Sequence, residues 1–306
     1  MGTPEFAVHS LRAIHESAHE VVGVITSTDK MGGRGGKKKL ESQVKKYAMS
    51  QDLKILQPSN LKAPSFIEEL RSLKADLQIV VAFRMLPVVV WDMPTLGTYN
   101  LHGSLLPKYR GAAPINWAII NGDMETGVTS FKLKHAIDTG DIVMQRPLAI
   151  EIMDTAGDVH DKMMLLAADV IKETVDRIAS DDIEFISQDD SLVSKAPKIF
   201  HKDCQIDFSK PTAQVFNFIR GLSPYPAAWT LLDNLQLDIY QAHALISKHE
   251  YNPGEFITDQ KKKLNIATLD GFIEVKQVKL QGRKKMDVNS FLNGYTIENC
   301  QILKQA

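Results

Sequence analysis

The sequence has few of the features that mark disulfide-bonded, metal-binding or membrane-spanning proteins. Its two cysteines, Cys204 and Cys300, are far apart, and no CxxC motif or Cys/His ligand spacing accompanies them. A disulfide framework or a zinc site is therefore not expected. The chain also has no apolar run long enough to span a membrane, and no signal peptide with a charged start and an apolar middle. These absences predict a soluble protein in the reducing cytoplasm.

An excess of charge of one sign is also missing. The chain has 36 Lys and Arg against 37 Asp and Glu, a net charge of −1. No global field draws such a protein to nucleic acid, so any RNA contact must come from local clusters. The 306 residues, 44% of them hydrophobic, are enough for a sizeable core. The length alone suggests roughly two domains.

The first part of the chain alternates strand and helix patterns. The continuous apolar runs "EVVGVIT" (20–26) and "DLQIVVAF" (76–83) are typical of buried parallel strands. Helical spacing of apolar residues predicts helices over 6–17 and 158–179. Strands that alternate with helices predict an α/β domain over residues 1–181, with a parallel-rich sheet covered by helices on both faces.

The pattern changes near residue 181. Residues 182–200 are polar and poorly periodic, as in a linker. From 201 to 306 we expect one helix, "TAQVFNFIRGL", followed by short strands with turns such as Asn252-Pro253-Gly254 between them. This pattern predicts a small β-barrel or a sandwich.

One polar pair stands out within "NLHGSLLP". Asn100 and His102 are two residues apart on a predicted strand, so both side chains point to one face. They lie near its C-terminal end, where open α/β sheets bind ligands. An imidazole can take a proton there, and a carboxamide can donate to a developing oxyanion. The loop "DTGD" offers Asp138 or Asp141 to orient the imidazole.

The plainer interpretation is a structural histidine. A single strand histidine is more often a hydrogen-bond partner than a catalyst. The asparagine two residues before it, the Gly-Ser turn after it and the glycine-flanked Asp loop bring the catalytic interpretation to about even. Residues alone leave the two open.

Several motifs together resemble a known family. They are "MGTPEFAV", "VVAFRMLP", "NLHGSLLPKYRGAAPINWAIINGD", "ETGVTSFKL", "IDTGDIV" and "QIDFSKPTAQVFNFIRGLSPYPAAW". They look like the methionyl-tRNA formyltransferase family among the folate-dependent formyltransferases. The resemblance implies a Rossmann-like formyltransferase domain followed by a small OB-like β-barrel domain. It also implies transfer of a formyl group from 10-formyltetrahydrofolate to the free amino group of initiator methionyl-tRNA, without a metal. We expect the protein to be a monomer.

The resemblance assigns roles residue by residue. The trio that stabilises charge and relays protons is Asn100, His102 and Asp138. Asp141 ranks below Asp138, because it matches the second Asp of the motif. The folate-contacting turn matches Ser104, Leu105, Leu106 and Pro107, and the pterin-pocket segment matches Phe83, Met85 and Leu86.

The basic run "GGRGGKKK" (32–39) is not a P-loop, because Met31 replaces the first glycine and no Ser or Thr follows Lys37. A charge run is usually a solvated loop, but the resemblance implies an insertion loop that contacts the tRNA acceptor end. The contacts would be Arg34, Lys37, Lys38 and Lys39. Residues 201–306 hold 13 Lys and Arg against 11 Asp and Glu, with clusters at 261–263 and 282–285. We expect this domain to hold tRNA.

The chain departs from the family at its start. Family members usually have a short apolar strand before "GTPEFA", whereas here Met1 precedes Gly2 directly. We therefore expect an upstream strand in the natural protein, since an empty central strand position leaves backbone groups unpaired. Other functions stay open: a formyltransferase for another amine such as an amino-sugar nucleotide, a 10-formyltetrahydrofolate hydrolase, or a non-catalytic RNA-binding module.

Overall fold

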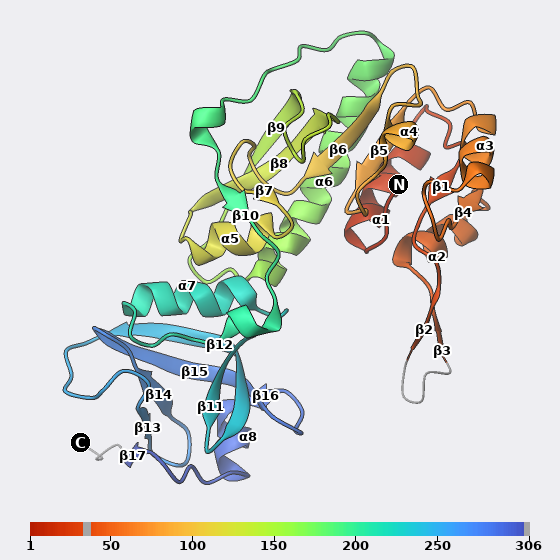
Figure 1. The fold of residues 1–306 in the computed structure, drawn as a ribbon. Coiled ribbons are helices and arrows are strands. Elements are labelled where there is room, and N and C mark those ends of the chain that lie inside the picture. The colour runs from red at the N-terminus through yellow and green to blue at the C-terminus, as the bar shows by residue number, and fades with distance from the viewer. Residues whose placement is uncertain (33–37, 303–306) are drawn as a thin grey trace. The chain divides into compact units, whose positions relative to one another are not determined.

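The computed structural model describes residues 1–32 and 38–302 and divides the chain into two compact units (Figure 1). Unit 1 comprises 1–111, 126–148 and 160–195, and unit 2 comprises 112–125, 149–159 and 196–306. Among the described residues, no helix combines the length and apolarity that a membrane span requires.

Unit 1 alternates short strands with helices, as the sequence predicts. Its first elements are α1 (Phe6–His15), β1 (Val24–Ile25), β2 (Lys30–Gly32), β3 (Lys38–Leu40), α2 (Gln43–Ser50), β4 (Ile55–Leu56), α3 (Pro64–Ser72) and β5 (Gln78–Val81). The chain continues with α4 (Val88–Trp91), β6 (Thr98–His102), β7 (Arg110–Gly111), β8 (Glu125–Lys132), β9 (Ile142–Ala149) and α6 (Ala156–Ala179).

The main sheet of unit 1 has the order β5-β6-β8-β9, and β1 pairs with β4 in a separate parallel sheet. β5 and β6 run parallel, whereas β6 and β8 run antiparallel. β5, β6 and β8 are mostly buried, as expected for strands of a sheet that helices cover, whereas the second half of β9 alternates with exposed residues. α6 lies against β8, where the hydroxyls of Thr174 and Ser130 are 2.7 Å apart.

Met1 and Gly2 lie between these two sheets. The Gly2 N–H donates to the Ile25 carbonyl of β1, and the Met1 carbonyl accepts from the Val81 N–H of β5. A cavity of about 320 Å³ adjoins them and is lined by residues of both strands, among them Val24, Ile25, Ile79 and Val81. Burial lowers the pKa of the Met1 amine to about 5. The upstream strand stays a prediction.

The basic run differs in part from its expected structure. β2 and β3 pair antiparallel, with Gly32 opposite Lys38, and form a hairpin that we call the basic hairpin. The sequence suggested a loop over 32–39, whereas Lys38–Leu40 is a strand. The helix α2 begins only after Ser42, whose hydroxyl caps it by accepting from the Lys45 N–H.

The polar segment after α6 also carries structure. It contains a 3₁₀ turn, η2 (Asp190–Leu192), and β10 (Lys195–Ala196), which pairs with β7. Before them, Ile186 forms a bridge with Ile142 of β9. Residues 182–195 therefore belong to unit 1 and are bonded to its strands.

Unit 2 is built around a seven-stranded sheet. Its elements are α5 (Pro114–Ile120), η3 (His201–Cys204), α7 (Thr212–Leu222), β11 (Ala228–Leu232), β12 (Leu235–Ile246), β13 (Phe256–Thr258), β14 (Leu264–Ala267), β15 (Gly271–Leu280), β16 (Met286–Asp287), α8 (Val288–Asn293) and β17 (Gln301–Ile302). The strand order is β11-β12-β15-β14-β13-β17, with β16 also paired to β15. The buried face of α7 packs on this sheet through Val215, Phe216, Ile219 and Leu222.

Candidate active site

The strand β6 carries Asn100 and His102 to the edge of the main sheet where it ends. Asn100 lies opposite Val80 of the parallel strand β5, and His102 lies opposite Thr129 of β8. Because β5 and β6 are parallel, the residues that follow both strands emerge at this same edge. We call this region the site edge: the end of β6, the turn Ser104–Pro107 and the loop Asp138–Asp141.

His102 is held at the site edge by a backbone contact. Only 7% of the residue is exposed, and its Nε2 donates to the Tyr109 carbonyl at 2.8 Å. A carbonyl can only accept, so in the neutral ring Nε2 carries the hydrogen and Nδ1 carries the lone pair. Nδ1 faces Asp138, whose Oδ2 lies 3.8 Å away. A proton taken up at Nδ1 would therefore have a carboxylate beside it.

Asp138 is held through its carboxylate. Its Oδ2 accepts from the Gly111 N–H at 2.9 Å, and its side chain is 11% exposed. Its backbone has φ +55°, in the left-handed region that only a minority of non-glycine residues adopt. Such a conformation persists where the surrounding structure holds it, which is common in catalytic loops.

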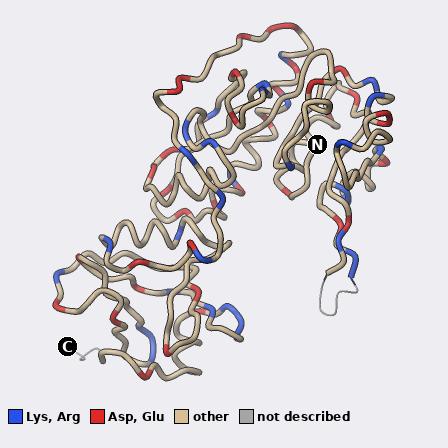
Figure 2. The backbone as a smooth tube through the Cα atoms, viewed as in Figure 1, with Lys and Arg blue, Asp and Glu red and all other residues tan. Residues whose placement is uncertain are grey.

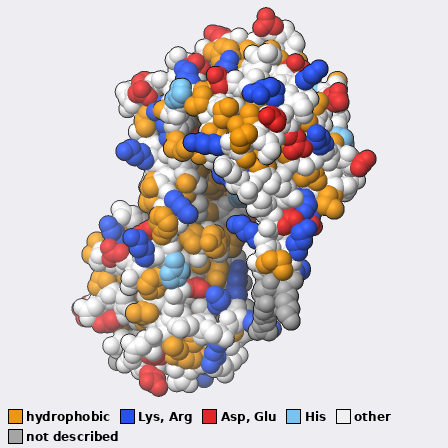
Figure 3. All heavy atoms as spheres, turned by 45° about the vertical axis from the view of Figure 1, so that its right-hand side comes forward, with side chains coloured by type: hydrophobic (Ala, Val, Ile, Leu, Met, Phe, Trp, Pro, Cys, Tyr) orange, Lys and Arg blue, Asp and Glu red, His pale blue; other side chains and the backbone are white. Residues whose placement is uncertain are grey.

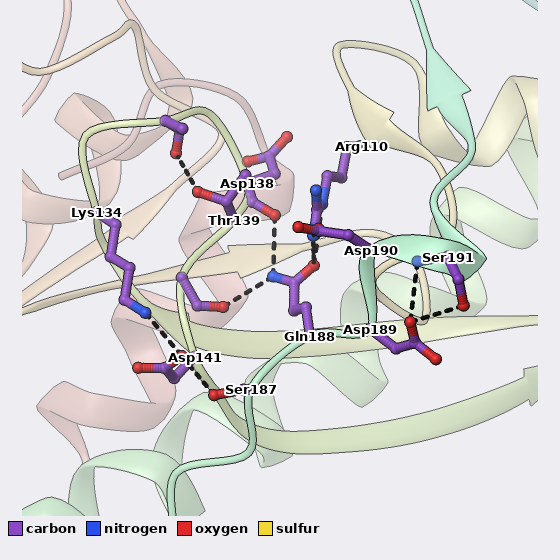
Figure 4. Close-up of polar contacts among 12 residues, drawn as sticks. Arg110, Lys134, Asp138, Thr139, Asp141, Ser187, Gln188, Asp189, Asp190 and Ser191 are labelled. Carbon is purple, nitrogen blue, oxygen red and sulfur yellow. Dashed lines mark hydrogen bonds and ion pairs between the residues drawn. The ribbon is translucent and has the colours of Figure 1, made fainter.

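Asp141 in the same loop is occupied elsewhere. Its Oδ1 accepts from the Lys134 ammonium at 2.8 Å and from the Ser187 hydroxyl at 3.4 Å (Figure 4). The structure thus places Asp138, and not Asp141, beside His102.

Asn100 is half-buried, and its carboxamide takes no hydrogen bond from the parts of the chain that the structure describes. A partly buried amide without a protein partner keeps both its donors for a ligand. Asn100 can therefore donate to an oxygen that gains negative charge next to His102.

The turn Ser104–Pro107 is shaped by a buried hydroxyl on the neighbouring strand. Thr129 Oγ1 donates to the Ser104 carbonyl at 2.6 Å and accepts from the Leu106 N–H at 3.0 Å. Gln145 adds a bond to the Leu106 carbonyl at 2.8 Å. The Ser104 hydroxyl is used inside the turn, where it donates to the Lys108 carbonyl. The sequence patterns do not single out Thr129 of β8 or Gln145 of β9, because a strand pattern does not show which groups the side chains of that strand bond.

The second predicted folate segment follows β5. Leu86 is buried in a core cluster with Val80 and Val90, and Phe83 packs against that cluster. Met85 is 74% exposed. Of the cofactor-binding candidates, Leu105 and Pro107 are half-buried and Leu106 is buried. The structure therefore brings 83–86 and 104–107 to one edge while leaving Met85 facing solvent.

The basic hairpin is only partly described. Arg34 and Lys37 lie outside the described residues. Lys38 and Lys39 are exposed on β3, and Figure 2 shows lysines on both hairpin strands. Lys39 pairs with Asp29 at 2.9 Å and with Glu41 at 3.6 Å. Hydrogen bonds, the largest from Lys45, hold the pKa of Asp29 well below its ordinary value. Asp29 is thus an anion at the base of the hairpin that partly neutralises Lys39.

Charged patches and metal ligands are the two other features that could mark a site among the described residues outside the site edge and the basic hairpin. On the face in Figure 3, basic side chains are mixed with acidic and hydrophobic ones. Within residues 1–32 and 38–302, no group of three or more His, Cys, Asp or Glu side chains could hold a metal ion.

Comparison with known proteins gives the family. The formyl transferase model matches residues 1–175, and the model of the formyl transferase C-terminal domain matches residues 198–296. A methionyl-tRNA formyltransferase from Parabacteroides distasonis is 52% identical over 305 residues, covering 96% of this chain and 94% of that protein. One from Phocaeicola vulgatus is 53% identical over 306 residues, covering 96% and 94%.

Solved structures show the same fold at lower identity. An N-formyltransferase from Helicobacter canadensis, solved with folinic acid and dTDP-3-aminofucose, has a TM-score of 0.67 at 23% identity and covers 91% of this chain and 97% of its own. The sugar 3N-formyl transferase WlaRD has a TM-score of 0.66 at 21% identity, with coverage of 92% and 97%. At these identities the likeness supports the fold alone. Together with the two family models and the half-identical relatives, it shows that this chain belongs to the formyl transferase family.

Proposed function

We propose that this protein transfers a formyl group from 10-formyltetrahydrofolate to the free amino group of initiator methionyl-tRNA. The observation that carries the proposal is the identity of about half over nearly the whole chain to methionyl-tRNA formyltransferases. The arrangement of Asn100, His102 and Asp138 at one sheet edge supports it, because direct transfer to an amine needs a base and an oxyanion donor.

His102 is the proton acceptor in this proposal. An amine attacks only as the neutral base and must lose a proton as the new bond to carbon forms. Nδ1 of His102 carries the lone pair, since Nε2 donates to the Tyr109 carbonyl. Once Nδ1 is protonated, the Asp138 carboxylate at 3.8 Å stabilises the imidazolium. Asp138 thus orients the ring and balances its charge.

Asn100 is the oxyanion donor. Bound 10-formyltetrahydrofolate would supply the formyl group, and the proton held by His102 would balance the N10 nitrogen that leaves when its bond to the formyl carbon breaks. The formyl oxygen gains negative charge as the amine attacks, and the free carboxamide of Asn100 can donate to it. The segments 83–86 and 104–107 would hold the folate, through Phe83, Met85, Leu86 and the turn Ser104, Leu105, Leu106 and Pro107.

Binding of tRNA is assigned to two parts of the chain. Arg34, Lys37, Lys38 and Lys39 would contact the acceptor end. Residues 201–306 would form the tRNA-binding domain after a catalytic domain (1–181) and a linker (182–200). Clusters of Lys and Arg at 261–263 and 282–285 offer charge for the phosphate backbone. We further propose that the protein acts as a monomer in the cytoplasm.

The test is a comparison of acceptors. Purified protein with formyl-labelled 10-formyltetrahydrofolate should formylate methionyl-tRNA and leave a dTDP-amino sugar unmodified, with little release of formate to water. Preferred formylation of the amino sugar, or formate release that methionyl-tRNA does not redirect, would contradict the proposal.

A further inference from the structure

Gln188 lies beside the site edge, in the segment that follows α6. Two residues before it, Ile186 and Ile142 exchange both backbone hydrogen bonds, at 2.8 and 2.9 Å. Ile142 directly follows the loop Asp138–Asp141. This bridge to β9 holds the backbone next to Gln188 in place. The Gln188 side chain points toward the loop that carries Asp138 (Figure 4).

The carboxamide of Gln188 makes four hydrogen bonds. Its Nε2 donates to the carbonyls of Asp138 at 2.9 Å and of Gly140 at 2.8 Å. Its Oε1 accepts from Arg110 Nε at 3.0 Å and Nη2 at 2.7 Å. Carbonyls only accept and a guanidinium only donates. The amide nitrogen of Gln188 must therefore face the two carbonyls, and its oxygen must face Arg110. Every donor and both acceptor positions of the side chain are filled.

These bonds join the two pieces of chain that hold Asp138. Arg110 directly precedes Gly111, whose N–H donates to the Asp138 carboxylate at 2.9 Å. Gln188 therefore holds the backbone carbonyl of Asp138, and Gly111, which follows Arg110 in the chain, holds the Asp138 side chain. The left-handed φ of Asp138 makes such support necessary.

We propose that Gln188 is a positioning residue that keeps the Asp138 carboxylate beside Nδ1 of His102. It does not touch the substrate; it acts through the backbone of Asp138 and Gly140. This inference rests on the proposed function, in which Asp138 balances the charge of His102. No feature of the sequence singles out Gln188, which lies in a polar segment expected to be a linker.

Two variants separate its contacts. Gln188→Ala removes all four bonds. Gln188→Glu has nearly the same shape and keeps an acceptor for Arg110, but it cannot donate to the two loop carbonyls. We expect kcat for formyl transfer to fall in both by roughly 10- to 100-fold, as for a displaced catalytic group, with KM for methionyl-tRNA little changed. Wild-type kcat in Gln188→Glu would overturn the proposal.

Hydrogen exchange tests the same contact without activity. Amide exchange over residues 133–142 should become faster in both variants, while exchange over β6 stays unchanged. Asp190→Asn is the matched control, since Asp190 contacts Arg110 at 2.9 Å from a side chain that is 84% exposed but does not bond the loop. We expect it to keep wild-type kcat and exchange.

The outcomes are distinct. Unchanged exchange in Gln188→Ala and Gln188→Glu would overturn the positioning role, whatever the kinetics. A wild-type protein that does not formylate methionyl-tRNA would instead contradict the proposed function, and the exchange experiment would then decide the role of Gln188 by itself.

Discussion

The site edge and the basic hairpin are built in opposite ways. At the site edge, His102 and Asp138 are nearly buried: His102 donates a hydrogen bond to a backbone carbonyl, and Asp138 accepts one from a backbone N–H. In the basic hairpin, Lys38 and Lys39 are exposed on a three-residue strand. A misplacement of about 1 Å can cost a catalytic group roughly 10²-fold in rate, whereas attraction to phosphate acts over about 8–10 Å at physiological salt. The fixed region therefore suits chemistry, and the exposed region suits binding of a charged polymer.

The largest effect that this contrast predicts is at Asn100. Asn100→Ala should lower kcat by about 10²–10³-fold, as expected for a lost oxyanion donor, and leave tRNA binding intact. Thermal stability should hardly change, because the carboxamide has no partner among the described residues. Asn100→Asp, which keeps the size but not the donor, should lose as much. A near-normal kcat in either variant, measured by steady-state kinetics, would contradict the role of Asn100 as the oxyanion donor.

The next effect separates two carboxylates of one loop. Asp138→Asn should lower kcat on the order of 10²-fold, since the imidazolium of His102 loses its counter-charge. Asp141→Asn should retain most of the activity, because Asp141 pairs with the exposed Lys134 and does not face His102. Surface pairs of this kind contribute at most about 1 kcal/mol to stability. Equal losses in the two variants, measured side by side, would show that the loop matters only as a whole.

A third prediction concerns the cavity between β1, which leads into the hairpin, and β5, which leads to the site edge. An apolar strand-forming segment of about six residues placed before Met1 should fill it and raise Tm. A Gly/Ser segment of equal length is the control and should stabilise less. Equal melting temperatures for the two extended chains would contradict a strand in this position.

The same chains should differ in their response to pH. In a chain that begins at Met1, burial lowers the pKa of the terminal amine from 8.0 to about 5. Below pH 8 the unfolded chain therefore binds a proton that the folded chain does not, so stability falls as the pH is lowered from 8 to 5. Extending the chain removes this amine from the cavity and should flatten that part of the profile of Tm against pH.

The smallest predicted effect lies in the basic hairpin. Lys38→Ala should weaken tRNA binding and reduce the slope of log affinity against log salt by about 1, as for one lost phosphate contact. Lys39→Ala should do less, because Asp29 and Glu41 already neutralise part of its charge. Binding measured over a salt series decides this, and a larger loss at Lys39 would reverse the assignment.

The sequence predicts much of this arrangement, because part of it is local. Apolar runs identify β1 and β5, and the spacing of Asn100 and His102 places both on one face of the strand β6. The α/β and β-rich parts follow from the same patterns, and the matching family models confirm the predicted fold class.

The remainder depends on contacts between residues far apart in the chain. Gln188 bonds the carbonyl of Asp138, 50 residues away, and Thr129 bonds that of Ser104, 25 residues away. No local pattern marks such side chains, since a glutamine or threonine at these positions is equally consistent with a surface residue. The basic hairpin was missed for a related reason: glycine and lysine carry little strand preference, and pairing of β2 with β3 forms it.

The most direct test of the account is the His102→Ala variant, with formyl transfer to methionyl-tRNA and binding of tRNA and folate measured on the same preparation. The account predicts that transfer falls by on the order of 10²-fold or more, while both ligands bind as they do to the wild-type protein. Transfer at the wild-type rate by a folded His102→Ala protein would contradict the central claim that this imidazole accepts the proton of the amine.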